Sequence, residues 1–138
     1  MNARYLVDKS ALARMAKPAV RERLGAIIEA GEAASCVIVD LEVLFSARSH
    51  RDYVEIRKRR ELAYERVEVT LAVLGRALEV QGELAKSGRH RVSIPDLLIA
   101  AAAEAARLTV LHYDRDFDLI AGITGQPVEW VVPRGTAN

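Results

Sequence analysis

Five acidic residues stand at positions where an α/β protein places its chemistry. Asp8, Asp114 and Asp116 follow short apolar runs that are typical of strands. Glu42 and Asp96 lie in the first turns of predicted helices. The carboxyl ends of parallel strands and the helix N-termini beside them converge on one edge of a sheet. We therefore expect one acidic pocket built from distant parts of the chain. Its members are Asp8, Glu42, Asp96, Asp114 and Asp116.

Clustered carboxylates repel one another and raise one another's pKa values, so such a pocket favours a bound cation. The pocket offers oxygen donors and no cysteine or paired histidine, which suits Mg²⁺ or Mn²⁺ better than Zn²⁺. A carboxylate-held divalent metal binds phosphate oxygens and activates water, which is the chemistry of phosphodiester hydrolysis. The sequence therefore predicts Asp8, Glu42, Asp96 and Asp114 as catalytic metal ligands, with Asp116 as a further ligand.

Each carboxylate also has a simpler structural interpretation. Asp96 stands three residues after Ser93, and the two residues can form a capping box at the start of a helix. Asp8 can be a turn residue after a strand, and Asp116 can cap a helix that begins at Phe117. Glu42 can be a solvated residue of a first helical turn. The coincidence of several acidic positions favours the metal site over these alternatives.

Positive charge is concentrated in RSHRDYVEIRKRR, residues 48–60, where Asp52 and Glu55 are the only acidic residues. Arginine and lysine offset phosphate charge along a nucleic-acid backbone. This segment therefore predicts weak substrate contacts. They would come from Arg48, Arg51, Arg57 and Lys58. The alternative is a solvated helix face with ion pairs four residues apart.

Strand and helix signals alternate along the chain, which predicts a mostly parallel sheet with helices on both faces. Predicted strands occupy residues 4–7, 35–39, 65–69, 109–113 and 127–132. Predicted helices occupy residues 10–17, 18–30, 41–47, 51–63, 71–87, 94–106 and 117–122. Ser10, Asp40, Thr70 and Ser93 are the expected helix caps.

The length of 138 residues suits one domain, expected at residues 1–133 with a polar tail at 134–138. The single Cys36 lies in an apolar run and is expected to be buried rather than to bind metal. No apolar run is long enough for a membrane span, and the N-terminus becomes charged too early for a secretory signal. We therefore expect a cytoplasmic protein. A net charge of +1 does not mark the whole chain as a nucleic-acid binder.

Four pieces of the chain resemble the PIN domain, and within it the VapC toxins of bacterial toxin–antitoxin pairs. They are YLVDKSAL (5–12), VDLEVLFSA (39–47), SIPDLLIAAAA (93–103) and LHYDRDFD (111–118). The resemblance implies a three-layer α/β/α ribonuclease that uses Mg²⁺ or Mn²⁺, forms a homodimer and is inhibited by a VapB antitoxin. Asp8 and Asp96 match the principal metal-binding aspartates of the family. Glu42 matches the acidic residue of its second motif, and Asp114 with Asp116 match its closing acidic motif.

Two positions depart from the family pattern: Lys9 replaces a small hydroxylated residue, and His112 replaces threonine or serine.

Two other functions remain open. A phosphoaspartyl protein also uses carboxylates and Mg²⁺, but Asp8 is not followed by an aspartate two positions on. A binding module without catalysis would use the acidic pocket to receive basic residues of a partner, which is also how an antitoxin would inhibit the enzyme. Trp130 is expected to pack in the core or a dimer interface rather than stack on a base.

Overall fold

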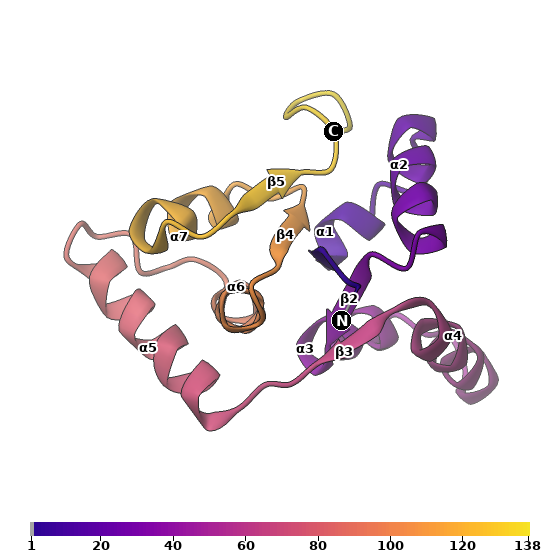
Figure 1. The fold of residues 1–138 in the computed structure, drawn as a ribbon, viewed down its shortest axis with the longest axis horizontal. Coiled ribbons are helices and arrows are strands. Elements are labelled where there is room, and N and C mark those ends of the chain that lie inside the picture. Colours follow the sequence, from indigo (N-terminus) through magenta and orange to yellow (C-terminus); the bar gives the residue numbers. More distant parts are fainter. Residues whose placement is uncertain (1) are drawn as a thin grey trace.

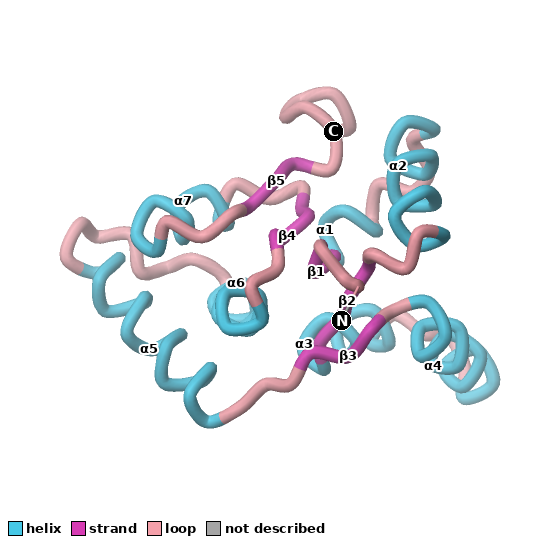
Figure 2. Tube along the Cα trace, viewed as in Figure 1, coloured by secondary structure: helices cyan, strands magenta, loops and turns pink. Residues whose placement is uncertain are grey.

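The computed structural model describes residues 2–138 and contains one sheet of five parallel strands in the order β3-β2-β1-β4-β5. The strands are β1 (Tyr5–Val7), β2 (Ala33–Cys36), β3 (Glu65–Val67), β4 (Thr109–His112) and β5 (Val128–Trp130). The helices are α1 (Lys9–Leu12), α2 (Pro18–Glu29), α3 (Val37–Phe45), α4 (His50–Ala63), α5 (Leu71–Ala85), α6 (Ile94–Ala106) and α7 (Asp116–Thr124). Figure 2 shows the short strands in the centre of the molecule with helices around them.

Helices cover both faces of the sheet, as expected for a three-layer α/β/α fold (Figure 1). Successive strand residues point to opposite faces, and β1 shows this directly. Leu6 joins a core with apolar residues of α3, α5, α6 and α7. Val7 joins the opposite core with α1 and α2. Both residues are fully buried, so the sheet is covered on each side. The predicted fold class is therefore confirmed.

The predicted strand at 35–39 is wrong in its second half. β2 ends at Cys36, and α3 begins at Val37, so Asp40 is a helical residue rather than an N-cap. Its side chain accepts a hydrogen bond from the Ser35 hydroxyl at 2.8 Å and pairs with Arg60 of α4 at 3.1 Å. These partners come from β2 and from a helix further along the chain. Tertiary contacts therefore decide the conformation of this apolar run against its β propensity.

The predicted helix at 10–17 is shorter than expected. Asp8 rather than Ser10 caps α1, because the Asp8 carboxylate accepts a hydrogen bond from the Ser10 N–H at 2.9 Å. The helix ends at Leu12, and turns lead to Pro18. Proline disfavours a helical conformation in the residue that precedes it, so α1 and α2 do not merge. The other predicted strands and helices occur close to their predicted bounds.

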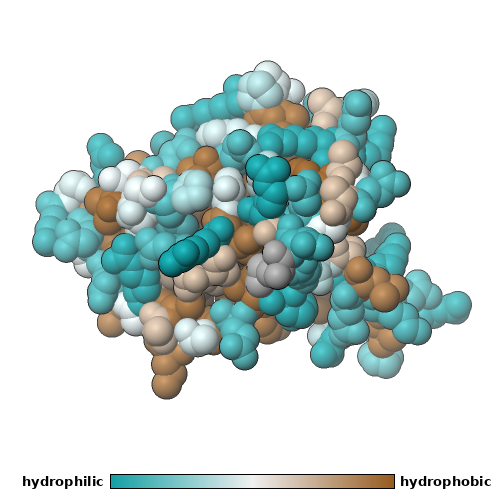
Figure 3. All heavy atoms as spheres, in the orientation of Figure 1, coloured by the Kyte–Doolittle hydropathy of each residue, from teal (hydrophilic) through white to brown (hydrophobic). Residues whose placement is uncertain are grey.

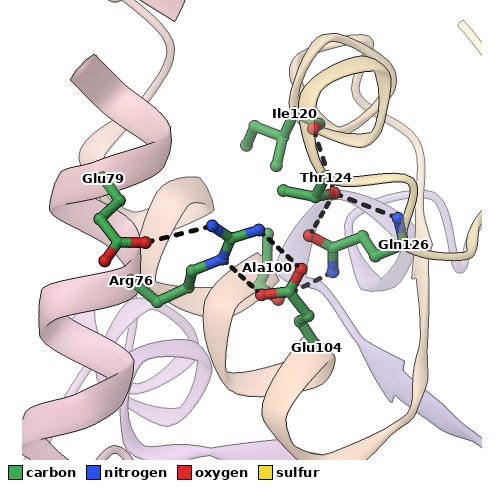
Figure 4. A network of polar contacts seen from close by, with 7 residues as sticks. All are labelled: Arg76, Glu79, Ala100, Glu104, Ile120, Thr124 and Gln126. Atoms are coloured by element: carbon green, nitrogen blue, oxygen red, sulfur yellow. Dashed lines mark hydrogen bonds and ion pairs between the residues drawn. The ribbon is translucent and has the colours of Figure 1, made fainter. Parts of the chain in front are cut away.

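Helix α6 is held between α5 and α7 by polar contacts (Figure 4). Arg76 of α5 forms an ion pair with Glu104 of α6 at 2.7 Å. Gln126, just after α7, donates a hydrogen bond to the Ala100 carbonyl at 2.8 Å. Between these contacts α6 buries small alanine side chains, which let it pack closely. The position of the first turn of α6, which carries Asp96, is thereby fixed.

The last residues fold back against Tyr113, the residue after β4. The Tyr113 hydroxyl accepts hydrogen bonds from the Gly135 and Ala137 N–H groups at 2.9 Å, and donates to Asn138 Oδ1 at 2.9 Å. Ala137 is buried. The domain boundary expected at residue 133 stays a prediction, but residues 134–138 lie against the fold.

Several large apolar side chains remain exposed, and Figure 3 shows hydrophobic atoms interrupting the hydrophilic surface near the start of α5 and over α4. They belong mainly to three helices: Val37, Leu41 and Phe45 of α3, Val54 and Leu62 of α4, and Leu71, Leu74 and Leu78 of α5. Val37, Leu41 and Phe45 follow one another at four-residue spacing and so lie along one face of α3, as apolar side chains of an interaction surface do. None of the helices within residues 2–138 has the length and apolar character of a membrane span.

Candidate metal centre

The pairing of β1 with β4 brings the first and fourth acidic positions together. Val7 pairs with Leu111 in register, and the Asp8 N–H donates to the Leu111 carbonyl at 2.9 Å. Asp114 follows β4 two residues beyond the strand end. The order of the strands reverses between β1 and β4, and crevices for ligands open at such a switch point.

The first turn of α6 brings Asp96 to the same edge. Ser93 occupies the N-cap position, but its side chain makes no capping hydrogen bond. Its N–H donates to Asp116 Oδ2 at 3.1 Å instead of to Asp96. The capping-box alternative for Asp96 is therefore wrong. Asp116 is likewise not the cap of α7, because the helix begins at Asp116 itself with Arg115 before it.

Four of the five predicted carboxylates line a single cavity of about 240 Å³, called the acidic cavity below. They are Asp8, Glu42, Asp96 and Asp114. The fifth, Asp116, adjoins this group, because one oxygen each of Asp96, Asp114 and Asp116 lie within 4.8 Å of one another. The structure thus places all five predicted side chains in one region, with Asp96 and Asp114 at its centre.

Burial and mutual repulsion disfavour the charged form of these carboxylates. Burial, followed by the charges of Asp8 and Asp114, raises the pKa of Asp96 from its ordinary 3.8 to about 8. Burial also raises the pKa of Asp8, although hydrogen bonds from Ser10 oppose the shift. Glu42, half-buried on α3, has a raised pKa because of burial and the nearby charge of Asp8. An arrangement of this kind favours a cation over the bare carboxylates.

Two carboxylate oxygens in the acidic cavity are buried without a hydrogen-bond partner among residues 2–138. They are Asp8 Oδ1 and Asp96 Oδ2. Buried polar atoms almost always have partners, and an exception calls for a cause. A cation coordinated by both oxygens would supply the missing interaction. The donor set, made only of carboxylate oxygens, fits a hard divalent ion.

Backbone hydrogen bonds orient the turn that carries Asp114. Asp114 Oδ1 accepts from the Asp116 N–H at 2.9 Å, and the Asp114 N–H donates to His112 Nδ1 at 3.1 Å. Burial lowers the pKa of His112 to about 4, so its ring is neutral and can accept this bond. The Tyr113 N–H donates to Ser10 Oγ at 2.9 Å, which ties the turn to α1. His112, one of the two departures from the family pattern, thus supports the backbone of Asp114.

The predicted substrate-binding arginines lie just before α4 or on it, and each is paired with an acidic residue of that helix. Arg48 pairs with Asp52 at 3.9 Å, Arg51 with Glu55 at 3.6 Å and Arg57 with Glu61 at 3.4 Å, each four residues apart. This is the pattern of a solvated helix face. Contact between RNA and these three arginines or Lys58 stays a prediction.

The sequence interpretation missed the basic residues that line the acidic cavity. Lys9 and Arg14 share its wall with the carboxylates. Arg14 is anchored by a hydrogen bond from Nη1 to the Ser10 carbonyl at 3.1 Å. Arg14 follows Ser10 by four residues. This helical spacing was the signal in the sequence that could have placed Arg14 near Asp8. Lys9, the second departure from the family pattern, places a cation next to Asp8.

Comparison with known proteins identifies the fold and the family. The model of the PIN domain matches residues 5–123. Ribonuclease VapC21 of Mycobacterium tuberculosis is 51% identical over 138 residues, which cover 99% of this chain and 100% of that protein. The chain belongs to the PIN-domain family and, within it, to the VapC proteins. The resemblance inferred from the four motifs is therefore confirmed.

Solved structures agree with this assignment. A DNA-bound VapBC from Salmonella typhimurium superimposes with a TM-score of 0.76 at 19% identity, over 94% of this PIN-domain chain and 99% of that one. VapBC-5 from Mycobacterium tuberculosis gives a TM-score of 0.62 at 25% identity, over 94% and 98% of the two chains. The first similarity shows the fold alone. The second structure is described as a member of the VapBC family of toxin–antitoxin systems.

Proposed function

We propose that this chain is the toxin of a VapBC-type toxin–antitoxin pair and acts as a metal-dependent endoribonuclease. The observation that carries this proposal is the acidic cavity at the switch point between β1 and β4 in a chain half identical to a protein named as a ribonuclease. Its substrate is RNA, and its reaction is hydrolysis of phosphodiester bonds. The cognate inhibitor is a VapB-type antitoxin.

The ligands of the metal are Asp8, Glu42, Asp96 and Asp114, with Asp116 beside them. Oxygen-only donors and the absence of cysteine and histidine from the acidic cavity favour Mg²⁺ or Mn²⁺. A divalent ion held there would lower the pKa of bound water and offset charge on the phosphate oxygens.

The protein's own groups prepare the acidic cavity for this chemistry. The Ser10 N–H fixes one oxygen of Asp8 and leaves the other without a hydrogen-bond partner. The Asp116 N–H likewise fixes Asp114 Oδ1. Lys9 and Arg14 stand at the wall of the cavity, where their charges attract and orient a phosphate. Positioned groups of this kind need little reorganisation during the reaction.

The surface of α3 supports the proposed antitoxin partner. Between α3 and α4 lies a cavity of about 460 Å³ lined by Leu41, Leu44 and Tyr53 together with charged residues, among which arginines outnumber acidic residues (Asp40, Arg57, Arg60, Glu61 and Arg66). A partner that combines apolar and acidic side chains suits this lining. The antitoxin would also place an arginine in the acidic cavity and so exclude metal and RNA.

The exposed leucines of α5 support the proposed homodimer, because a second copy would bury them.

RNA cleavage by the purified protein tests the proposal. Wild type, Asp8→Asn and Asp96→Asn are incubated with total and structured RNA in Mg²⁺, Mn²⁺ or EDTA. We expect metal-dependent cleavage by wild type and none by either variant, and the variants should no longer arrest growth when expressed. Glu29→Gln, which removes an exposed carboxylate on α2, is the matched control and should keep full activity.

Retained cleavage or toxicity in both aspartate variants would refute the assignment of the catalytic carboxylates. A wild-type protein that binds an antitoxin peptide but neither metal nor RNA would instead be a binding module without catalysis. Isothermal titration with Mn²⁺ separates these outcomes, because the metal is then measured without RNA.

A further inference from the structure

A second cavity, of about 460 Å³, opens directly beside the acidic cavity. We call it the basic pocket, because Arg14, Arg115 and Arg134 line it together with Tyr113 and Trp130. Ser10, Arg14 and Asp114 line both cavities, so the two share a wall. A strand of RNA with one phosphate at the carboxylates would therefore have the neighbouring nucleotide at the basic pocket.

The three guanidinium groups of the basic pocket have no acidic partner. Within residues 2–138, Arg14, Arg115 and Arg134 take part in none of the ion pairs. Arg51 and Arg57 of α4 differ, because each is paired with a glutamate of its own helix. Charges that are not neutralised within the protein are available to a phosphate.

Two of these arginines are also held in place before any ligand arrives. Arg14 donates to the Ser10 carbonyl and lies over the Tyr113 ring, with its guanidinium carbon 4.7 Å from the ring centroid. Arg134 lies over the Trp130 ring at 5.3 Å. Cation–π contacts of this kind restrict a side chain without neutralising its charge. Less conformational entropy is then lost on binding.

The Trp130 side chain that lies under Arg134 is itself held in place by its neighbours. Trp130 Nε1 donates to Asp118 Oδ2 at 3.1 Å, and its backbone carbonyl accepts from Arg23 Nη1 at 2.9 Å. The Trp130 ring also packs edge-on against Tyr113, with centroids 5.1 Å apart. The indole thus supports an arginine.

We propose that the basic pocket is a phosphate subsite of the ribonuclease, which binds the RNA backbone next to the cleaved bond through Arg14, Arg115 and Arg134. This inference rests on the proposed function, because it places the substrate relative to the acidic cavity. Guanidinium groups match phosphate oxygens in geometry and charge. The contacts are to the backbone, so the subsite positions RNA without reading its sequence.

Binding of RNA without cleavage tests the subsite. The probe is a fluorescein-labelled single-stranded RNA of mixed sequence, and its anisotropy is measured in EDTA over a series of KCl concentrations. The variants are Arg14→Gln and Arg134→Gln. Arg4→Gln is the matched comparison, because it makes the same change at an exposed arginine that is paired with Glu32 and lines neither cavity. Thermal unfolding establishes that each variant is folded.

Loss of one phosphate contact on a single strand lowers the slope of log K against log salt by about 0.7. We therefore expect Arg14→Gln and Arg134→Gln each to lower the slope by that amount and to weaken binding about fivefold at 0.1 M salt. Arg4→Gln should have a smaller effect. Equal losses in all three variants, or no loss in the first two, would overturn the subsite.

Three further outcomes decide between this inference, the proposed function and a protein-docking role. Cleavage that needs Asp96, combined with RNA binding that ignores Arg14 and Arg134, would uphold the ribonuclease and overturn the subsite. Binding that needs both arginines, with no cleavage under any condition, would uphold an RNA site and overturn the ribonuclease. If the two variants weaken only the binding of the cognate antitoxin, the basic pocket is a protein-docking surface and the subsite is overturned.

Discussion

Replacement of Asp96 by asparagine should stabilise the metal-free protein while it abolishes activity. The pKa of Asp96 is 3.8 in an ordinary environment and about 8 in the folded protein. Between these values the folded chain keeps a proton that the unfolded chain releases, so stability falls as pH rises from about 4 to about 8. Below pH 4 both states are protonated, and this contribution to stability is fully present.

The magnitude follows from the size of the shift. Each pH unit between the two pKa values costs about 1.4 kcal/mol, so at pH 7 the upper bound is about 4 kcal/mol. Relaxation and water entry reduce such penalties, and about 2 kcal/mol is the expected gain for Asp96→Asn at pH 7. For a chain of 138 residues this gain corresponds to a rise in Tm of roughly 6 °C. At pH 4 the gain should vanish.

The assay is thermal unfolding in EDTA at pH 4 to 8 for wild type, Asp96→Asn and the exposed-carboxylate control Glu29→Gln. Wild type and the control should lose stability together as pH rises, whereas Asp96→Asn should lose much less. A wild-type Tm that stays level or rises over this interval, with Asp96→Asn no more stable at pH 7, would refute the reasoning. The burial and repulsion inferred at Asp96 would then be absent in solution.

Three further predictions concern the metal, the core and a helix end. Mn²⁺ or Mg²⁺ should raise the Tm of wild type, more at pH 8 than at pH 5 because ligands must lose their protons, and should not raise that of Asp96→Asn; equal shifts in both proteins would contradict a site at Asp96. Asp40→Ala should cost roughly 3–5 kcal/mol in urea unfolding, because it leaves the buried Arg60 guanidinium without its partner; a loss below about 1 kcal/mol would mean that the pair is solvated. Arg107, exposed at the C-cap of α6, has a left-handed backbone with φ of 58°, so Arg107→Gly should raise stability by roughly 0.5–1 kcal/mol, and Arg107→Ala, which keeps the Cβ, should not.

The sequence was most informative where several acidic residues occupied positions that converge on one edge of the predicted sheet. Asp8 and Asp96 were assigned to one edge of a parallel sheet from strand and helix signals alone, and the structure brings them to one cavity. The helix-cap explanation of Asp96 could be excluded only by a contact between distant residues, the hydrogen bond from Ser93 to Asp116. No local pattern encodes that contact.

Other features of the structure become apparent only from tertiary contacts and side-chain geometry. SCVIV has the composition of a buried strand, but Val37 begins a helix because Asp40 meets Ser35 and Arg60 inside the fold. The positive charge of α4 predicted substrate contacts. The ion pairs along the helix become apparent only from side-chain geometry. Arg134 was assigned to a polar tail, since the fold-back onto Tyr113 depends on hydrogen bonds across the chain.

The C-terminal segment that begins after α7 lies outside the stretch that matches the PIN model, yet Trp130 and Arg134 form one wall of the basic pocket. The carboxylates of the acidic cavity all lie inside that stretch. If the basic pocket is the proposed subsite, mutation there can change how tightly RNA is held without touching the carboxylates of the acidic cavity. Exchange of residues 124–138 between VapC relatives would change how tightly RNA is held while the chemistry stays the same.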